Sequence, residues 1–171
     1  MNPLMDRRHF MIGLGAGLGS VTGASALANT NAFVDLGWKD LLPRGQTSIP
    51  PSLRNLIDHD QAPMASQQPQ STGVRSEWNE QVVRLPGFVV PLDYSGSGVT
   101  AFILVPFVGA CIHVPPPPAN QLVFVTTQTP YQSGGLYEPV DVIGELRIGT
   151  MNTQLAEIAY TMTADSIKPY R

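Results

Sequence analysis

The sequence predicts an all-β protein, a small five-stranded Greek-key barrel of the OB type, with a β-sandwich as the alternative. Three observations support this prediction. Short runs rich in β-branched and aromatic residues recur from residue 81 onward. Glycine and proline, 16 of each in 171 residues, separate these runs. No stretch shows the i, i+3, i+4 apolar spacing of a long amphipathic helix.

Residues 1–28 have the order of a secretory signal peptide. An arginine pair, Arg7 and Arg8, leads into an apolar, glycine-rich run at residues 10–18, and a small-residue cleavage site ends at Ala28. The residues around the arginine pair resemble a twin-arginine signal. We therefore expect export to the periplasm, with cleavage near Ala28. The apolar run is too short to span a bilayer.

The net charge argues against one class of partner, and the cysteine count excludes an internal disulfide. Removal of residues 1–28 takes Arg7, Arg8 and Asp6 away from ten basic and thirteen acidic residues, which leaves a net charge of −4. A mildly acidic chain without a basic cluster argues against nucleic acid as a partner. No later segment is long and apolar enough for membrane insertion of the mature chain. The single cysteine, Cys111, cannot form an internal disulfide.

Residues 29–73 are expected to form an N-terminal arm, a short helix and a linker. Three apolar residues of the arm are expected to dock on the body of the protein: Trp38, Leu41 and Leu42. Two prolines precede a short helix predicted over residues 52–59, with Ser52 at its cap. The stretch from Gln61 to Gly73 is rich in Gln, Pro and Ser, which is typical of a linker or mobile loop.

Residues 74–171 are expected to form the barrel itself. The predicted strands cover residues 81–92 (bent at Pro86-Gly87), 99–105, 111–113, 121–127, 140–148 and 159–164.

The residues best suited to chemistry lie in the third of these strands. In an extended strand, residues i and i+2 project from the same face, so Cys111 and His113 would stand side by side. Thiolate and imidazole are ligands that zinc and copper prefer. A zinc site needs about three or four protein ligands. The spacing does not select among the candidates for the missing ones: Asp58, His59, Asp60, Glu77, Glu80 and Glu138.

Two other interpretations of the same pair stay open. Cys111 and His113 can be buried core residues, because free cysteine is among the most often buried residue types. They can also form the dyad of a Cys-dependent hydrolase or redox enzyme, although no nucleophile elbow or oxyanion motif accompanies them. Asn120 and Gln121 either orient a ligand through His113 or satisfy backbone groups left free by the preceding prolines.

The stretch from Phe102 to Gln121, FILVPFVGACIHVPPPPANQ, resembles the signature of a bacterial periplasmic family, the domain-of-unknown-function family 3299. The segments at residues 38–43, 87–92 and 142–146 are also similar to that family, so the resemblance covers nearly the whole mature chain. It implies a protein often encoded beside ABC transporter permeases, in some cases in gene clusters linked to zinc supply. It carries over no catalytic residues.

Residues and resemblance together predict a non-enzymatic periplasmic protein that binds a metal and assists an ABC-type transport system. Zinc is the expected metal, with copper or no metal as alternatives. Cys111 and His113 would be its ligands, and Asn120 and Gln121 would support them. The alternative is a structural or interaction module of the cell envelope, with Cys111 and His113 in its core. The expected partner is an ABC transporter permease or another envelope protein.

Overall fold

The computed structural model describes three stretches of the chain: residues 33–46, 68–111 and 116–170. They belong to one compact unit, Asn31–Arg171. The expected signal peptide, the helix predicted over residues 52–59 and His113 lie outside the described residues. No helix within the three stretches is long and apolar enough to cross a membrane.

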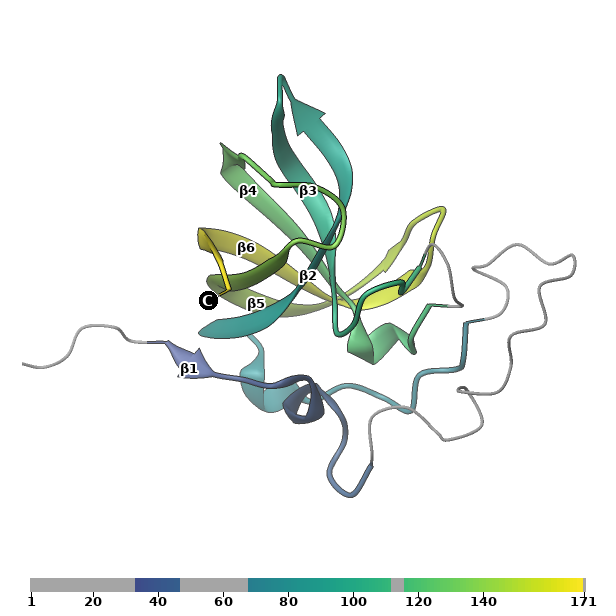
Figure 1. Cartoon of the computed structure of the whole chain (residues 1–171). Helices are drawn as coiled ribbons and strands as arrows, with labels where there is room; N and C mark the ends of the chain where they lie inside the picture. Colours follow the sequence, from purple (N-terminus) through teal and green to yellow (C-terminus); the bar gives the residue numbers. More distant parts are fainter. Residues whose placement is uncertain (1–32, 47–67, 112–115, 171) are drawn as a thin grey trace, which may run out of the picture. The chain divides into compact units, whose positions relative to one another are not determined.

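Five strands close into a barrel (Figure 1). They are β2 (Gln81–Ser95), β3 (Gly98–Val105), β4 (Val123–Tyr131), β5 (Pro139–Asn152) and β6 (Glu157–Pro169). The strand order is β2-β3-β4-β6-β5, and an antiparallel β2–β5 ladder closes the ring. β4 and β6 run parallel, whereas the other four barrel ladders are antiparallel. This is the Greek-key connectivity of an OB-type barrel, so the predicted fold class is confirmed.

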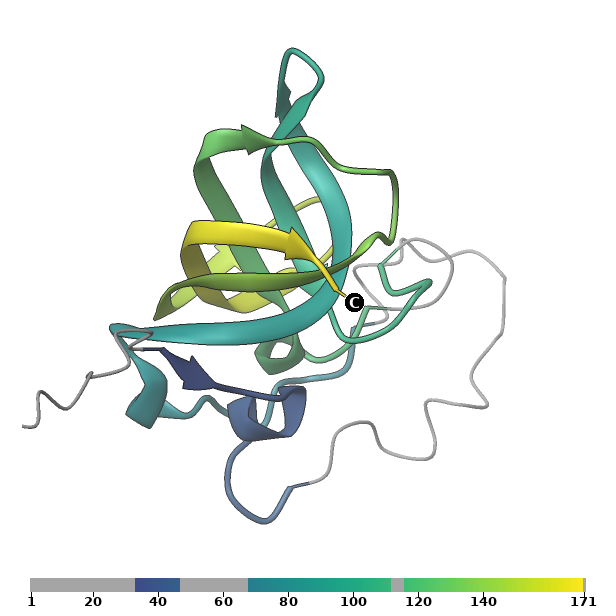
Figure 2. The ribbon, with the colours of Figure 1, turned by 60° about the vertical axis from the view of Figure 1, so that its left-hand side comes forward.

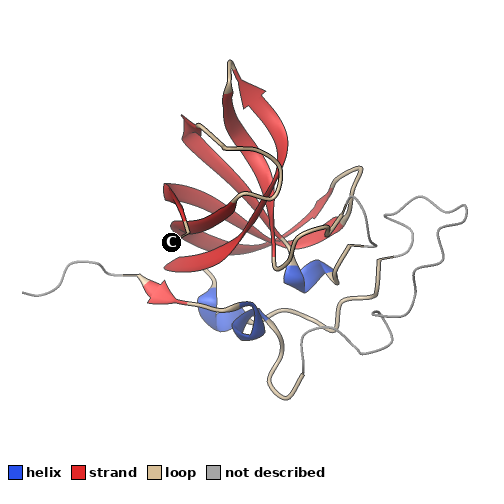
Figure 3. Ribbon diagram, viewed as in Figure 1, coloured by secondary structure: helices blue, strands red, loops and turns tan. Residues whose placement is uncertain are grey.

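The elements outside the barrel are short. They are β1 (Val34–Asp35) and three 3₁₀ turns, η1 (Trp38–Leu41), η4 (Ser76–Trp78) and η5 (Ala119–Gln121). β1 pairs in parallel with β2. Figure 3 shows that helical structure in the described residues is confined to these turns. The first two elements bring the arm onto the barrel, where Leu41 joins the core and Trp38 packs against it, as the sequence predicts.

β2 is a long, curved strand that belongs to two ladders (Figure 2). Its first half pairs with β5 and its second half with β3, and the two ladders meet at Phe88. The curvature brings Gly87 against β3. A Cβ atom at Gly87 would lie 2.8 Å from the side chain of Leu104 and 2.9 Å from the carbonyl oxygen of Val105. Only glycine fits there, which explains the bend predicted at this position.

The core has two parts because β3 is buried on both faces. Phe102 and Leu104 point into the larger cluster, which fills the barrel. Ile103 and Val105 belong to a smaller cluster that packs on the other face of the strand. Double burial explains why this strand is a continuous apolar run rather than an alternating one. The smaller cluster also contains Cys111.

Candidate functional site

Cys111 lies in a turn and not in a strand. Its φ is +70°, in the left-handed region, and Gly109 two residues earlier has φ +94°. Ala110 forms only an isolated bridge. Cys111 is therefore not extended, as a strand over residues 111–113 requires, and the rest of that predicted strand lies outside the described residues. A turn follows β3, and Ala110 and Cys111 are buried after it. The same-face argument for Cys111 and His113 loses its basis, and His113 itself lies outside the described residues.

The Cys111 thiol is enclosed by apolar side chains. The residue is 1% exposed, and its cluster includes Val90, Ile103 and Leu122. Tyr137 packs against this cluster, and its Oη donates a hydrogen bond of 2.8 Å to the carbonyl oxygen of Ala110.

This burial decides the protonation state of the thiol. Burial raises the pKa of Cys111 to about 12, so the thiol is protonated at neutral pH. A cysteine nucleophile needs a lowered pKa, because the thiolate is the reactive form. Zinc would also bind Cys111 as a thiolate, and the ion's own charge would have to overcome the cost of ionising the thiol in this setting.

The side chains of Asn120 and Gln121 bind the backbone of the N-terminal arm. Both are buried, at 0% and 1% exposed. The Asn120 Nδ2 donates to the carbonyl oxygen of Gly73 at 2.6 Å, and the Gln121 Nε2 donates to that of Trp38 at 2.9 Å. The two side chains thus fasten η5 to η1 and to the segment before η4, and they satisfy a backbone carbonyl in each. The Oδ1 of Asn120 has no hydrogen-bond partner in the described part of the chain.

Two of the carboxylates expected as further ligands, Glu77 and Glu138, bind other groups and lie in separate ion-pair and hydrogen-bond networks. Glu77 pairs with Arg44 at 3.4 Å and with Arg75. Glu138 accepts hydrogen bonds from Ser133 and from the backbone N–H of Gly134. Within residues 33–46, 68–111 and 116–170, no group of three or more His, Cys, Asp or Glu side chains gathers to hold a metal ion. The candidates Asp58, His59 and Asp60 lie outside these residues.

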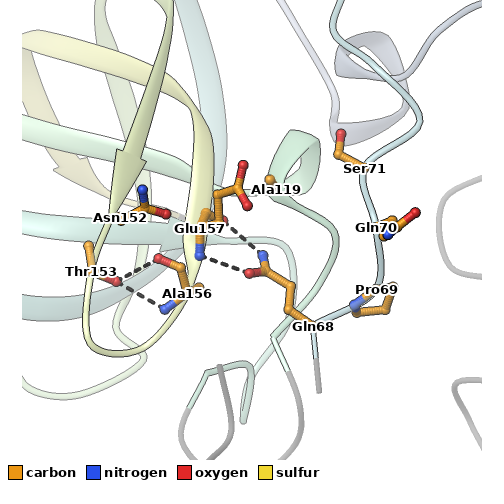
Figure 4. A pocket seen from close by; sticks show the side chains of 9 residues that line it. All are labelled: Gln68, Pro69, Gln70, Ser71, Ala119, Asn152, Thr153, Ala156 and Glu157. Atoms are coloured by element: carbon orange, nitrogen blue, oxygen red, sulfur yellow. Dashed lines mark hydrogen bonds between the residues drawn. The ribbon is translucent and has the colours of Figure 1, made fainter. Parts of the chain in front are cut away.

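A polar pocket of about 480 Å³ lies at the start of β6 (Figure 4). We call it the β6 pocket. Its volume falls within the range of about 300–1,000 Å³ that is usual for ligand pockets. Its lining residues come from the segment before η4, from η5 and from the β5–β6 turn: Gln68, Pro69, Gln70, Ser71, Ala119, Asn152, Thr153, Ala156 and Glu157. Glu157 is the one charged residue among them.

One wall of the β6 pocket is a turn fixed by its own hydrogen bonds. The hydroxyl of Thr153 donates to the carbonyl oxygen of Ala156 at 2.9 Å and accepts from the N–H groups of Leu155 and Ala156. A turn held in this way keeps its shape without a ligand, so this wall of the pocket is preformed.

The opposite wall is attached through the side chain of Gln68. Its Oε1 accepts the N–H of Glu157, and its Nε2 donates to the carbonyl oxygens of Glu157 and Pro117, each at 2.8 Å. All three bonds reach far along the chain, with Glu157 89 residues away. The sequence did not reveal this role, because Gln68 lies in a stretch whose composition is typical of a linker.

The match to a family model decides which family the chain falls in. The model described as "Protein of unknown function (DUF3299)" matches residues 38–169. The chain belongs to the DUF3299 family. A crystal structure of a DUF3299 family protein from Pseudomonas aeruginosa PAO1 is similar with a TM-score of 0.72 and 36% sequence identity, over 82% of this chain and 97% of that one. A search of the curated proteins gives no match.

Proposed function

We propose that this DUF3299 protein is a non-enzymatic binding module of the cell envelope. The barrel is a rigid scaffold, Cys111 is part of its core, and the β6 pocket is its contact site. One observation carries the proposal: the only cysteine of the chain is buried among apolar side chains with its pKa raised to about 12. The residue best suited to covalent chemistry is therefore held in its unreactive form.

The polar residues around the candidate site support the same proposal. Asn120 and Gln121 are used to hold the arm, and Tyr137 is used to close the loop that carries Cys111. The β6 pocket, in contrast, offers polar side chains around a preformed turn. The preformed turn needs no ordering when a partner binds, which lowers the entropic cost of recognition at that wall.

The envelope location rests on the signal peptide expected at residues 1–28. The partner class rests on the resemblance to family 3299, whose members are often encoded beside ABC transporter permeases. A permease or another envelope protein is therefore the proposed partner. The chain's net negative charge and its lack of a basic cluster disfavour nucleic acid.

Site-specific crosslinking in cells tests this function. A photo-crosslinking amino acid is placed at Gln70, which lines the β6 pocket, and in a matched control at Asp93, an exposed residue near the β2–β3 turn. We expect one defined crosslinked envelope protein from position 70 and none from position 93. No product from position 70, or the same product from both positions, would contradict the proposal.

Zinc binding is the second candidate function. The observation in its favour is the Cys111-x-His113 spacing in the sequence. Of the two predicted supporting residues, Asn120 would act through its Oδ1, because its Nδ2 and the Nε2 of Gln121 already donate to Gly73 and Trp38. Copper is the other metal that this ligand pair suits. Under this alternative Cys111→Ser removes a bound ion from a folded protein, whereas in our proposal it only lowers stability.

A further inference from the structure

The first residue of β6 presents an incompletely paired backbone. On one side, Glu157 is in register with Asn152 of β5. On the other side, the ladder with β4 begins only at the Val123–Tyr160 pair. The N–H and C=O of one residue in an extended strand point to the same side. At Glu157 both groups are bound by the Gln68 carboxamide, which is a side chain and not a strand.

A carboxamide carries the same donor and acceptor as a peptide group. In an antiparallel ladder, two opposite residues of a hydrogen-bonded pair exchange both N–H···O bonds. Gln68 makes this pair of bonds to Glu157 with one side chain, at 2.8 Å each. It thus occupies the place that one residue of an added strand would take.

We propose that this position is where an extended segment of a partner protein docks, with its backbone displacing the Gln68 side chain from Glu157. The inference rests on the proposed function, because it takes the β6 pocket as the contact site. β6 lies between β4 and β5, so the segment would pair only at the start of β6, before the ladder with β4 begins at Tyr160. In strand addition of this kind, main-chain hydrogen bonds give the affinity.

The surroundings of Glu157 suit such a segment. The β6 pocket leaves about 480 Å³ beside the Gln68 carboxamide. Asn152 and Thr153 flank it on one side, and Gln70 and Ser71 on the other (Figure 4). The carboxylate of Glu157 is the one charge among the lining residues. It favours a segment that carries a lysine or arginine.

The Gln68 side chain competes with the partner from within the same chain. An intramolecular contact of this kind acts as a ligand at an effective concentration in the millimolar range or above. Removal of the side chain should therefore raise the affinity for a peptide, although it also removes three native hydrogen bonds. A residue that was only a structural clip would lower stability when removed and would give no gain in peptide binding.

The test is an NMR titration of the ¹⁵N-labelled exported chain with a capped five-residue peptide of alternating alanine and threonine with lysine at its centre. The variants are Gln68→Ala and Gln68→Glu, which keeps the shape but loses both donors. We expect Gln68→Ala to bind at least tenfold more tightly than the wild type, with the largest shift at the Glu157 amide. The same peptide with its central amide N-methylated should lose this gain, because it lacks the donor to Glu157.

Three results would overturn the inference. They are no gain in affinity of Gln68→Ala over the wild type, an unchanged Glu157 amide in both variants at millimolar peptide, and equal binding of the N-methylated peptide. If Gln68→Ala does not fold, Gln68→Asn, which is too short by one methylene, takes its place. A failed titration together with position-specific crosslinking from Gln70 refutes strand addition alone. Failure of that crosslinking refutes the contact site itself.

Discussion

The hydroxyl of Tyr160 joins the arm to the barrel, and its removal should be costly. Tyr160 lies on β6 and is 0% exposed. Its Oη donates to the carbonyl oxygen of Leu41 in η1 at 2.9 Å and accepts from the N–H of Arg75, next to η4, at 2.6 Å. In Tyr160→Phe the ring stays and only the oxygen is lost. The expected effect thus comes from two backbone groups that lose their partner, and not from a cavity.

The magnitude follows from the burial of the two groups. A buried backbone group left unpaired costs roughly 1–3 kcal/mol. Leu41 is fully buried, whereas Arg75 is half-buried and water can replace part of its bond. We therefore expect Tyr160→Phe to lower the free energy of unfolding by about 2–4 kcal/mol.

Urea unfolding followed by tryptophan fluorescence measures this loss, because Trp38 and Trp78 both pack against the barrel core. The matched control is Tyr94→Phe, since Tyr94 is 56% exposed on β2. It should change stability by less than about 0.5 kcal/mol. A loss below about 0.5 kcal/mol in Tyr160→Phe, or equal losses in both variants, would refute the argument that this hydroxyl fastens the arm.

Two further predictions concern the bend of β2 and the core thiol. Gly87→Ala places a Cβ 2.8 Å from Leu104, and the resulting strain should lower the free energy of unfolding by roughly 1–3 kcal/mol in the same urea assay; an unchanged midpoint would contradict the tight approach of β2 and β3. Burial in the folded state favours the neutral thiol of Cys111 and raises its pKa from 9.0 to about 12. The stability this gives is fully present below about pH 9 and is lost as the pH rises from there toward about 12. Between pH 8 and pH 10 the wild type should therefore lose more stability than Cys111→Ala, by roughly 1 kcal/mol, and parallel losses would show that the thiol is not buried.

The barrel could be predicted because its strands carry local signals. The β2–β3 hairpin turns at Gly96-Ser97, where Gly96 has φ +60°, as expected for a glycine-led two-residue turn. The continuous apolar run of β3 marks a strand buried on both faces. The predicted strand ends differ from the observed ones. Gln121 lies in η5 and β4 begins at Val123, because the buried amide of Gln121 is used to bind the arm.

The candidate site could be predicted only in part, because it depends on contacts that are distant in sequence. The sequence singles out Cys111 because it is the only cysteine, and burial in the core is one of the interpretations that it leaves open; the structure shows that Cys111 is buried. Its positive φ has no signal in the sequence, since cysteine is not a residue that usually marks such a turn. Gln68 had no signal either, because its partners Pro117 and Glu157 are 49 and 89 residues away.

The central claim is that Cys111 belongs to the core of a binding module. Its most direct test is to measure the metal content of three exported proteins isolated without chelators: the wild type, Cys111→Ser and Cys111→Ser/His113→Ala. Our account predicts less than stoichiometric zinc or copper in all three proteins. It also predicts that Cys111→Ser stays folded but is less stable by about 1–3 kcal/mol. One zinc or copper ion per wild-type chain, lost from a folded Cys111→Ser variant, would contradict the account and make Cys111 a metal ligand.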